Sequence, residues 1–480
     1  MSFSPAPRRP DVSPLAEGLL SRSFQPGLSP DGKTADAATA AFSRAVEHGF
    51  YESWGTAEQV ARSTRAFIED ELLQTGVYRD PSSEAAERGD SALPASVTDA
   101  EFGTDRPVGT FVDFDKTLTT GGPLGPVPAR MISGVTVNPG YRRRGILKHM
   151  MTDALARSVD DGIPLAALTV SEGSIYGRFG FGAATRTESI RVHTGHGPEK
   201  YMPRHPASGR VREVDPTKLG PVVDDVFARF HAATPGSLGR PAAYRYTSTG
   251  QWSPRDIASW DRDLRAAVHV TEDGGVGGYV VFAAEDSAEG RTVRVRDLIA
   301  VDALSTSELW RYLSALDLVE RVVQDRAPVG NAVRHAATNP RAIATTAVED
   351  MVWLRLLDVS ACLRHRQWNA DGRIRLRISD GLGISDGLYE VTVSGGAAQV
   401  EQLDPEDQGG RLPQTEGGRA GARAVPSLGM SVETLGSIYL GDVSLRTLHA
   451  VGRIDATDTD IAAASAVMDL PTPPYCATFF

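Results

Sequence analysis

Hydrophobic residues recur every three or four positions in several stretches of the chain, and this spacing predicts amphipathic helices. In the first part of the chain these stretches are residues 36–53, 56–73 and 145–160. Other stretches are short, rich in β-branched and aromatic residues and bounded by turn residues, as strands are. They are residues 108–118, 129–137 and 165–171. Helices and strands therefore both occur up to a boundary near residue 200, where His, Gly and Pro become frequent.

A similar order of elements returns in the next part of the chain. The pattern predicts, in order, a helix over 214–234, a hairpin that turns at Gly274 and Gly275, a strand over 291–302 and a helix over 304–323. This order matches that of the first part, although the two sequences do not match. The last part has three alternating strands and a closing helix, predicted over 372–379, 387–395, 397–403 and 459–470.

These patterns predict an α+β (α/β) protein with three domains. A length of 480 residues fits this number, because a domain takes about 100–200 residues. The predicted division is a loose N-terminal tail over 1–35 and domains over 36–198, 199–350 and 351–480. Residues 80–107 and 405–424 are rich in polar and turn-forming residues and are expected to be exposed loops.

Charge and composition narrow the class of protein. The formal net charge is −11 and the pI is about 5.5, which is unlike the basic surplus of nucleic-acid-binding proteins and suits cationic partners such as polyamines. Two cysteines, Cys362 and Cys476, are too few for a disulfide framework or a four-cysteine zinc site, so a reduced, cytoplasmic compartment is expected. No apolar run reaches the ~20 residues of a membrane span. The N-terminus lacks the apolar segment of a signal peptide, which leaves secretion by another route open.

Residues 133–155, SGVTVNPGYRRRGILKHMMTDAL, combine a strand, a turn and a helix around three arginines. Gly145 falls in the first turn of the helix, where free N–H groups and the helix dipole favour an anion. The missing Cβ lets a phosphate approach the backbone, and arginine side chains add forked donors. Three arginines alone are typical of a solvated basic surface. A strand before them and an amphipathic helix after them favour a pyrophosphate site instead.

The order Arg-Arg-Arg-Gly-Ile-Leu after VTVNP resembles the acyl-CoA pyrophosphate loop of the GNAT acetyltransferase superfamily, whose motif is Q/R-x-x-G-x-G/A. Leu147 departs from the small residue at the end of that motif. Residues 165–182, LAALTVSEGSIYGRFGFG, contain a tyrosine after a strand, as GNAT enzymes commonly do. Together the two stretches closely resemble the Eis (enhanced intracellular survival) family of bacterial N-acetyltransferases.

The resemblance implies a fold for each of the three sections. It implies a catalytic GNAT domain, a second, degenerate GNAT domain and a C-terminal sterol-carrier-like domain, assembled as a homohexamer. The second GNAT section has no arginine-glycine loop after its strand at residues 294–302, so no cofactor is expected there.

The resemblance also implies an acetyl-CoA site and a catalytic pair without a metal. The backbone of Val135, Thr136 and Val137 would pair with the pantetheine arm like an added strand. The pyrophosphate would lie on Arg143, Arg144, Gly145, Ile146, Leu147 and Lys148, and the cofactor would be flanked by Ser171 and Glu172. Tyr176 would be the general acid. The carboxylate of Phe480 would be the general base. A terminal carboxylate is ionised at neutral pH and can therefore accept a proton.

Two function classes remain open at this point. The first is acetyl transfer to primary amines of polycationic small molecules such as aminoglycosides, at more than one position, with protein lysines as an alternative substrate. The second is a binding protein that holds a lipid or another apolar ligand in its last domain and uses the GNAT part for regulation. The aromatic residues Phe42, Phe50, Tyr51 and Trp54 either line a substrate pocket or form helix core.

Two further motifs point to other chemistry. Residues 27–34, GLSPDGKT, have the spacing of a P-loop, but the preceding residues are mostly polar and end at Pro26, which is unlike a central strand. His193 and His196 lack the glutamate of a zinc-binding HExxH helix. We therefore expect neither nucleotide hydrolysis nor a metal.

Overall fold

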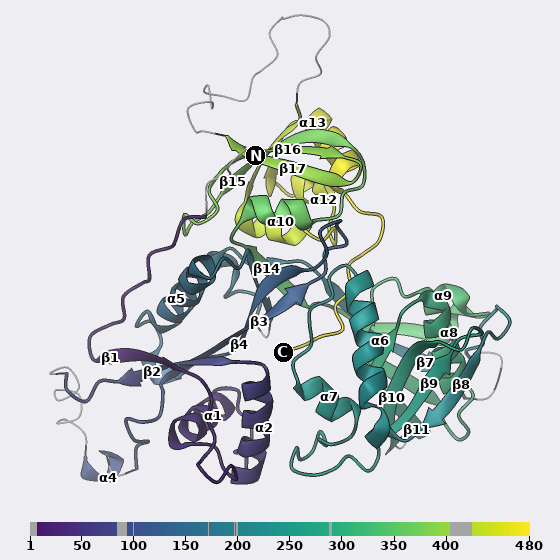
Figure 1. Ribbon diagram of the computed structural model, residues 1–480, viewed down its shortest axis with the longest axis horizontal. Coiled ribbons are helices and arrows are strands. Elements are labelled where there is room, and N and C mark those ends of the chain that lie inside the picture. Colours follow the sequence, from purple (N-terminus) through teal and green to yellow (C-terminus); the bar gives the residue numbers. More distant parts are fainter. Residues whose placement is uncertain are drawn as a thin grey trace, which may run out of the picture.

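The computed structural model describes residues 7–83, 94–98, 100–170, 172–195, 197, 200–287, 290–403 and 425–480. Within these residues the strands form three sheets of seven, seven and five strands. Figure 1 shows three lobes, each built around one sheet, with the last residues of the chain near their meeting point. The mixed α/β class predicted from the sequence is confirmed.

The first sheet has the order β1-β2-β3-β4-β5-β14-β6. Its strands are β1 (Leu19–Phe24), β2 (Leu73–Arg79), β3 (Gly109–Leu118), β4 (Val127–Val137), β5 (Leu165–Thr169), β14 (Val352–Leu356) and β6 (Gly182–Ala183). The helices of this part of the chain are α1 (Ala37–Gly49), α2 (Ala57–Glu69), α4 (Ala95–Thr98) and α5 (Ile146–Asp160). Phe42 of α1 and Met150 of α5 belong to different core clusters, because these helices cover opposite faces of the sheet.

The first two helices begin where polar residues can cap them. The side chain of Asp36 accepts a hydrogen bond from the N–H of Thr39 at the start of α1. Thr56 and Gln59 exchange hydrogen bonds in a capping box at the start of α2. Each cap satisfies backbone N–H groups that the helix itself leaves free, which explains why both helices start where the periodic pattern does.

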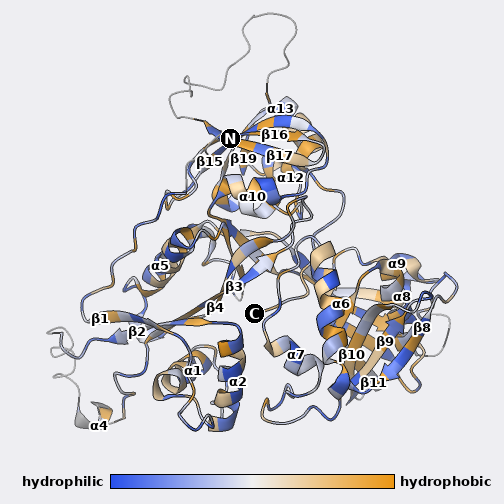
Figure 2. Cartoon of the chain, viewed as in Figure 1, coloured by the Kyte–Doolittle hydropathy of each residue, from blue (hydrophilic) through white to orange (hydrophobic). Residues whose placement is uncertain are grey.

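The second sheet has the order β8-β9-β10-β11-β12-β7-β13. Its strands are β8 (Arg210–Val214), β9 (Arg265–Val270), β10 (Val276–Ser287), β11 (Gly290–Ala300), β12 (Arg321–Pro328), β7 (Arg186–His193) and β13 (Ile343–Asp350). The helices are α6 (Gly220–Ala233), α7 (Ala243–Ser248), α8 (Ala303–Ser314) and α9 (Ala332–Ala336). Polar and hydrophobic residues occur together on α2 and α6 in Figure 2, as expected of helices with one buried face.

The first two sheets exchange a strand. β7 follows the elements of the first sheet in sequence, yet it pairs with β12 and β13 of the second sheet. β14 follows the elements of the second sheet, yet it pairs with β5 and β6 of the first. The chain therefore crosses to the second sheet between β6 and β7, ahead of the predicted boundary at residue 198, and returns to the first sheet between β13 and β14, at the predicted boundary at residue 351.

The third sheet has the order β17-β16-β15-β18-β19. Its strands are β15 (Gly372–Ser379), β16 (Gly387–Ser394), β17 (Ala397–Leu403), β18 (Ser427–Ser431) and β19 (Ile454–Asp455). The helices are α10 (Val359–His365), α11 (Val432–Ile438), α12 (Leu445–Ala450) and α13 (Asp458–Met468). One core cluster contains Phe114 of the first sheet together with Ile374 and Leu435 of this lobe, so the two lobes share buried apolar surface.

Two sequence predictions of local structure are wrong. Residues 1–35 are not a loose tail throughout, because β1 pairs with β2 along six residues at the edge of the first sheet. An edge strand tolerates the polar side chains that argued against a strand here. The helix predicted over 304–323 ends at Ser314, and Arg321 begins β12. Leu318 adopts a positive φ of 63°, which a helix cannot continue through.

Candidate active site

The parallel strands β4 and β5 separate at the centre of the first sheet. They pair from Ala129 and Leu165 to Ile132 and Leu168, after which β5 ends and β4 continues to Val137 with β3 alone as its partner. Ala129–Ile132 are buried, whereas residues 133–137 are half-buried. The backbone of Val135, Thr136 and Val137 thus borders an opening in the sheet and can pair with an extended ligand.

The arginine loop connects β4 to α5 with two residues in the left-handed region. Arg143 has a φ of 65° and Gly145 a φ of 78°, and no side chain caps the first turn of α5. A positive φ is strained for arginine, and such strain is typical of functional loops. Ile146 is buried and holds the start of the helix in the core, while Leu147 is half-buried and Lys148 is exposed.

The charges of this loop are available to a ligand. Among the described residues no carboxylate forms an ion pair with Arg142, Arg143, Arg144 or Lys148, and the guanidinium of Arg144 lies 5.1 Å from the centre of the Tyr141 ring. The uncapped N–H groups at the start of α5 stand beside these charges. This combination suits a pyrophosphate, which needs backbone donors and positive charge together.

A segment that the sequence did not assign to the site lies beside this loop. The carbonyl oxygen of Pro14 lies close to Gly145, at 3.4 Å from where a Cβ would stand. Ser13 is tied to α5 through hydrogen bonds with His149 and Thr152. No motif marked residues 8–18, because their role depends on contacts more than a hundred residues away along the chain.

Tyr176 stands after β5 at the start of a short 3-10 helix, Gly177–Phe179. Its ring is buried and meets Phe181 edge to face at 6.3 Å. Burial raises the pKa of the Tyr176 hydroxyl, and the negative charge of Glu172 raises it further. Glu172 itself is exposed and accepts a hydrogen bond from Ser174. Ser171 lies outside the described residues, as do His196, residues 84–93 and 99, and the loop 405–424.

The segment from residue 475 to Phe480 reaches the opposite side of the same opening. The hydroxyl of Thr169, the last residue of β5, donates a hydrogen bond to a main-chain oxygen of Phe480 at 2.5 Å. The Phe480 ring meets Phe114 edge to face at 5.9 Å. Phe480 packs with the core on the α1 face, whereas Tyr176 belongs to the core on the α5 face. The two predicted catalytic residues therefore lie on opposite faces of the sheet, with Phe480 bonded to the last residue of β5 and Tyr176 seven residues further along the chain.

The glycines after Tyr176 make room for the third lobe. A Cβ on Gly182 would stand 2.0 Å from the carbonyl oxygen of Glu433, and a Cβ on Gly180 would stand 2.8 Å from a methyl group of Val432. Gly436 of α11 also lies close to the Leu354 carbonyl, at 2.5 Å from where a Cβ would stand. The YGRFGFG run thus carries a docking surface for α11 as well as the tyrosine.

The four aromatic candidates separate into two groups. Phe42 is buried in the core, whereas Phe50, Tyr51 and Trp54 are exposed. Gly49 at the end of α1 approaches Thr136 of β4, with a Cβ placed 2.5 Å from the threonine Cβ, so the residues that follow lie near the opening. Trp54 meets an exposed aromatic residue missed by sequence reasoning, Phe102, at 6.2 Å between ring centres.

No helix among the described residues has the length and apolar character needed to cross a membrane. In the same residues, no group of three or more His, Cys, Asp or Glu side chains is arranged to hold a metal ion.

Three family models match the chain. Residues 72–184 and 236–356 match acetyltransferase (GNAT) domains, and residues 359–477 match a sterol carrier protein domain. The chain therefore consists of two GNAT domains and a C-terminal sterol-carrier domain.

Relatives that align with most of this chain are named N-acetyltransferases. An uncharacterized N-acetyltransferase of Streptomyces avermitilis is 30% identical over 420 residues, which cover 85% of this chain and 94% of that protein. The N-acetyltransferase Eis of Mycobacterium tuberculosis is 30% identical over 370 residues, covering 74% and 81%. The crystal structure of Eis1 from Mycobacterium abscessus superimposes with a TM-score of 0.71 at 22% identity, covering 96% of this chain and all of that one. A GCN5-related N-acetyltransferase from Anabaena variabilis gives a TM-score of 0.70 at 18% identity, with the same coverage.

Proposed function

The chain belongs to the Eis family of GNAT N-acetyltransferases, and from this premise we propose that it transfers the acetyl group of acetyl-CoA to a primary amine of a polycationic small molecule such as an aminoglycoside. The observation that carries the proposal is the opening between β4 and β5 beside a loop whose arginines have no carboxylate partner in the described part of the chain. An acyl-CoA needs both features, a strand edge for its pantetheine arm and a cationic helix start for its pyrophosphate.

The bound acetyl-CoA would supply an acetyl thioester. Val135, Thr136 and Val137 would hold its extended arm, and Arg143, Arg144, Gly145, Ile146, Leu147 and Lys148 would hold its pyrophosphate. Ser171 and Glu172 would flank it. An isolated tyrosine has a pKa near ~10 and burial raises that of Tyr176, so its hydroxyl would stay protonated and could give a proton to the departing sulfur.

The carboxylate of Phe480 would receive the proton that the attacking amine must lose. An amine is protonated at neutral pH and cannot attack a carbonyl until it is neutral. A terminal carboxylate is ionised at that pH and attracts a cationic substrate. The position of Phe480 and Tyr176 on opposite faces of the sheet supports a base on one side of the reacting carbon and an acid on the other.

The exposed aromatic residues suit the substrate side of the site. Phe50, Tyr51 and Trp54 follow α1, whose last residue approaches Thr136. Aromatic faces bind both cations and the apolar faces of sugar rings. The net charge of −11 favours cationic substrates over anionic ones. We also propose that the enzyme acts as a homohexamer, acetylates such substrates at more than one position and resides in the bacterial cytoplasm.

The test is release of free CoA thiol from acetyl-CoA with a panel of aminoglycosides. Three proteins are compared: wild type, Tyr176→Phe, and a version extended by a few residues past Phe480. Turnover that depends on the amine in wild type and is lost in both variants supports the proposed pair. Turnover that survives the extension overturns Phe480 as the base. Turnover with lysine peptides alone favours a protein substrate, and no turnover with any amine favours the lipid-binding alternative.

A further inference from the structure

The second GNAT fold has an opening that corresponds to the one in the first. β11 and β12 are the parallel neighbours at its centre and pair only from Thr292 and Arg321 to Arg294 and Val323. β11 then continues to Ala300 and β12 to Pro328. The first sheet separates in the same way between β4 and β5. By topology, this second opening is where the acyl donor would lie if the second fold bound one.

The N-terminus of α8, the helix that follows the second opening, does not favour binding of an anion. Asp302 caps α8 by accepting a hydrogen bond from the N–H of Ser305 at 2.6 Å. In the first fold the equivalent cap position is Gly145, with no side chain. A carboxylate at this position satisfies a helix N–H and repels phosphate. The second opening is therefore available for another occupant.

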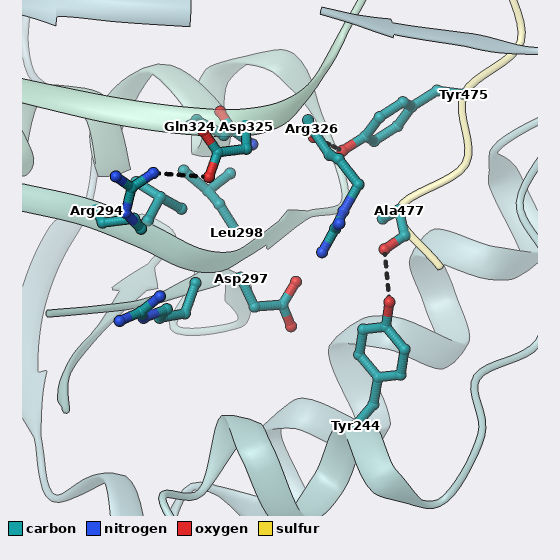
Figure 3. A pocket seen from close by; sticks show the side chains of 11 residues that line it. Tyr244, Arg294, Asp297, Leu298, Gln324, Asp325, Arg326, Tyr475 and Ala477 are labelled. Carbon is teal, nitrogen blue, oxygen red and sulfur yellow. Dashed lines mark hydrogen bonds and ion pairs between the residues drawn. The ribbon is translucent and has the colours of Figure 1, made fainter. Parts of the chain in front are cut away.

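The chain's own C-terminal segment lies at this opening. A cavity of about 130 Å³ is lined by residues 294–298 of β11, residues 324–326 of β12, Tyr244, Tyr475 and Ala477. Figure 3 shows Tyr475 and Ala477 along one wall, and the hydroxyl of Tyr244 directed at the Ala477 carbonyl. The segment thus passes the second opening on its way to the first.

Several contacts hold the segment to the second lobe. The N–H of Tyr475 donates to Pro235, and its hydroxyl donates to the carbonyl of Arg326 at 2.8 Å. The buried hydroxyl of Thr478 donates to the carbonyl of Leu238 at 2.9 Å. Gly236 permits the approach, since its missing Cβ would lie 2.9 Å from the Tyr475 nitrogen.

Tyr244 of the second lobe contacts the backbone of Phe479, the residue before Phe480. Its hydroxyl oxygen accepts a hydrogen bond from the N–H of Phe479 at 2.7 Å and lies 3.3 Å from the Phe479 carbonyl. The Arg240 guanidinium lies 4.4 Å from the centre of the Tyr244 ring. Arg240 is itself fixed by two hydrogen bonds to Asp297, at 2.8 and 2.7 Å. A buried ion pair therefore supports the ring whose hydroxyl holds the backbone one residue before Phe480.

We propose that the second GNAT fold is a clamp for residues 475–480 and that Tyr244 is a positioning residue for the catalytic carboxylate. The inference rests on the proposed role of Phe480 as the base. Tyr244 does not touch the reacting atoms. It fixes Phe479, so that Phe480 meets Thr169 and its carboxylate reaches the substrate amine from a constant direction. Loss of such positioning by about 1 Å can cost as much as ~100-fold in rate.

The test uses the full chain, expressed with Phe480 as its last residue. Tyr244→Phe removes only the hydroxyl and keeps the ring on Arg240. Tyr246→Phe is the matched control, because it lies on the same helix and its hydroxyl bonds to Glu69 instead of the segment. Tyr475→Phe is a second variant that removes the hydrogen bond to Arg326. Two readouts are taken: the rate at which carboxypeptidase releases phenylalanine, and kcat and KM for acetyl transfer.

We expect Tyr244→Phe to speed phenylalanine release and to lower kcat about 10-fold with an unchanged KM for acetyl-CoA. Tyr475→Phe should also speed phenylalanine release and lower kcat. Tyr246→Phe should match wild type in both readouts. Wild-type release rates in both Tyr244→Phe and Tyr475→Phe would overturn the clamp. Faster release without any change in kcat would overturn Tyr244 as a positioning residue for the catalytic carboxylate. The extended protein separates the two proposals: if it remains active while Tyr244→Phe still speeds release, the segment is clamped but Phe480 is not the base.

Discussion

At the scale of single residues, the site depends on a few groups whose surroundings change their ordinary chemistry. Burial and Glu172 raise the pKa of Tyr176, which keeps a proton on the hydroxyl of this residue after β5. Arg143 holds a positive φ that costs backbone energy, and Gly145 holds one at little cost. Tyr176 should affect kcat and the arginine loop should affect KM for acetyl-CoA, so substitutions can distinguish their roles.

Tyr176→Phe tests the general acid. General acid catalysis typically contributes 10²–10⁴-fold, so we expect kcat to fall by about that factor while KM for acetyl-CoA stays near the wild-type value. A raised pKa means that the acid form persists to higher pH. The alkaline decline of the wild-type rate that Tyr176 causes should therefore begin above pH ~10 and be missing from the residual activity of the variant. An alkaline limb that persists in Tyr176→Phe would assign the proton to another group.

Arg144→Gln tests the pyrophosphate loop. This side chain is exposed and, among the described residues, has no carboxylate partner, so its removal should leave the free energy of unfolding nearly unchanged. We expect KM for acetyl-CoA to rise about 10-fold at low salt, and by less at 1 M salt, where the Debye length is only ~3 Å. Arg178→Gln is the control, because Arg178 is an exposed basic residue outside the loop. Equal KM values for the two variants would argue against a pyrophosphate at Arg144.

At the scale of elements, the strand, loop and helix of residues 127–160 could be predicted from the sequence because their signals are local. The apolar face of α5, the turn before it and the glycine at its start all lie within a short stretch. The exchange of β7 and β14 and the position of β1 could not be predicted in this way. Both depend on partners far along the chain, and β1 carries the polar residues of an edge strand. The clamp at Tyr244 was missed for the same reason.

Gly182→Ala tests the contact between β6 and α11. A Cβ at this position would stand 2.0 Å from the Glu433 carbonyl, so α11 must move away from the first sheet. Overpacking of this kind typically costs ~1–3 kcal/mol, and we expect a loss of that size in the free energy of unfolding, measured by denaturant titration. Gly381→Ala is the control, because a Cβ there meets nothing within 4 Å. If the two variants are equally stable, the YGRFGFG glycines are not needed for docking.

At the scale of the whole molecule, the three lobes are joined in ways that make them interdependent. β7 and β14 bind the two GNAT folds to each other, and one core cluster runs from the first sheet into the third lobe. Figure 1 shows the chain descending from the third lobe to end between the other two, where the site lies. A change at a contact between lobes should therefore alter both stability and acetyl transfer.

The buried ion pair between Arg355 and Asp380 tests this interdependence. Arg355 belongs to β14 in the first sheet and Asp380 to the third lobe, and both side chains are inaccessible to solvent. Burial alone would raise the pKa of Asp380, but Arg355 and the N–H groups of Leu382 and Ser385 together lower it. A carboxylate with a lowered pKa stabilises the fold above its unfolded value of ~3.9, and this contribution is lost as the pH falls through the folded pKa.

Removing one member of this pair should cost more than removing both. Arg355→Met leaves an unpaired buried carboxylate, and the expected loss is ~3–5 kcal/mol in the free energy of unfolding at pH 7. The double variant Arg355→Met, Asp380→Leu removes the uncompensated charge and should recover most of that loss, with less dependence on pH than wild type as the pH falls below ~3.9. The rate of acetyl transfer should fall more in the single variant than in the double variant. The reason is that β14 pairs with β5, whose last residue, Thr169, contacts Phe480. If the single variant is as stable as wild type yet inactive, the pair acts on the site directly and not through the contact between lobes.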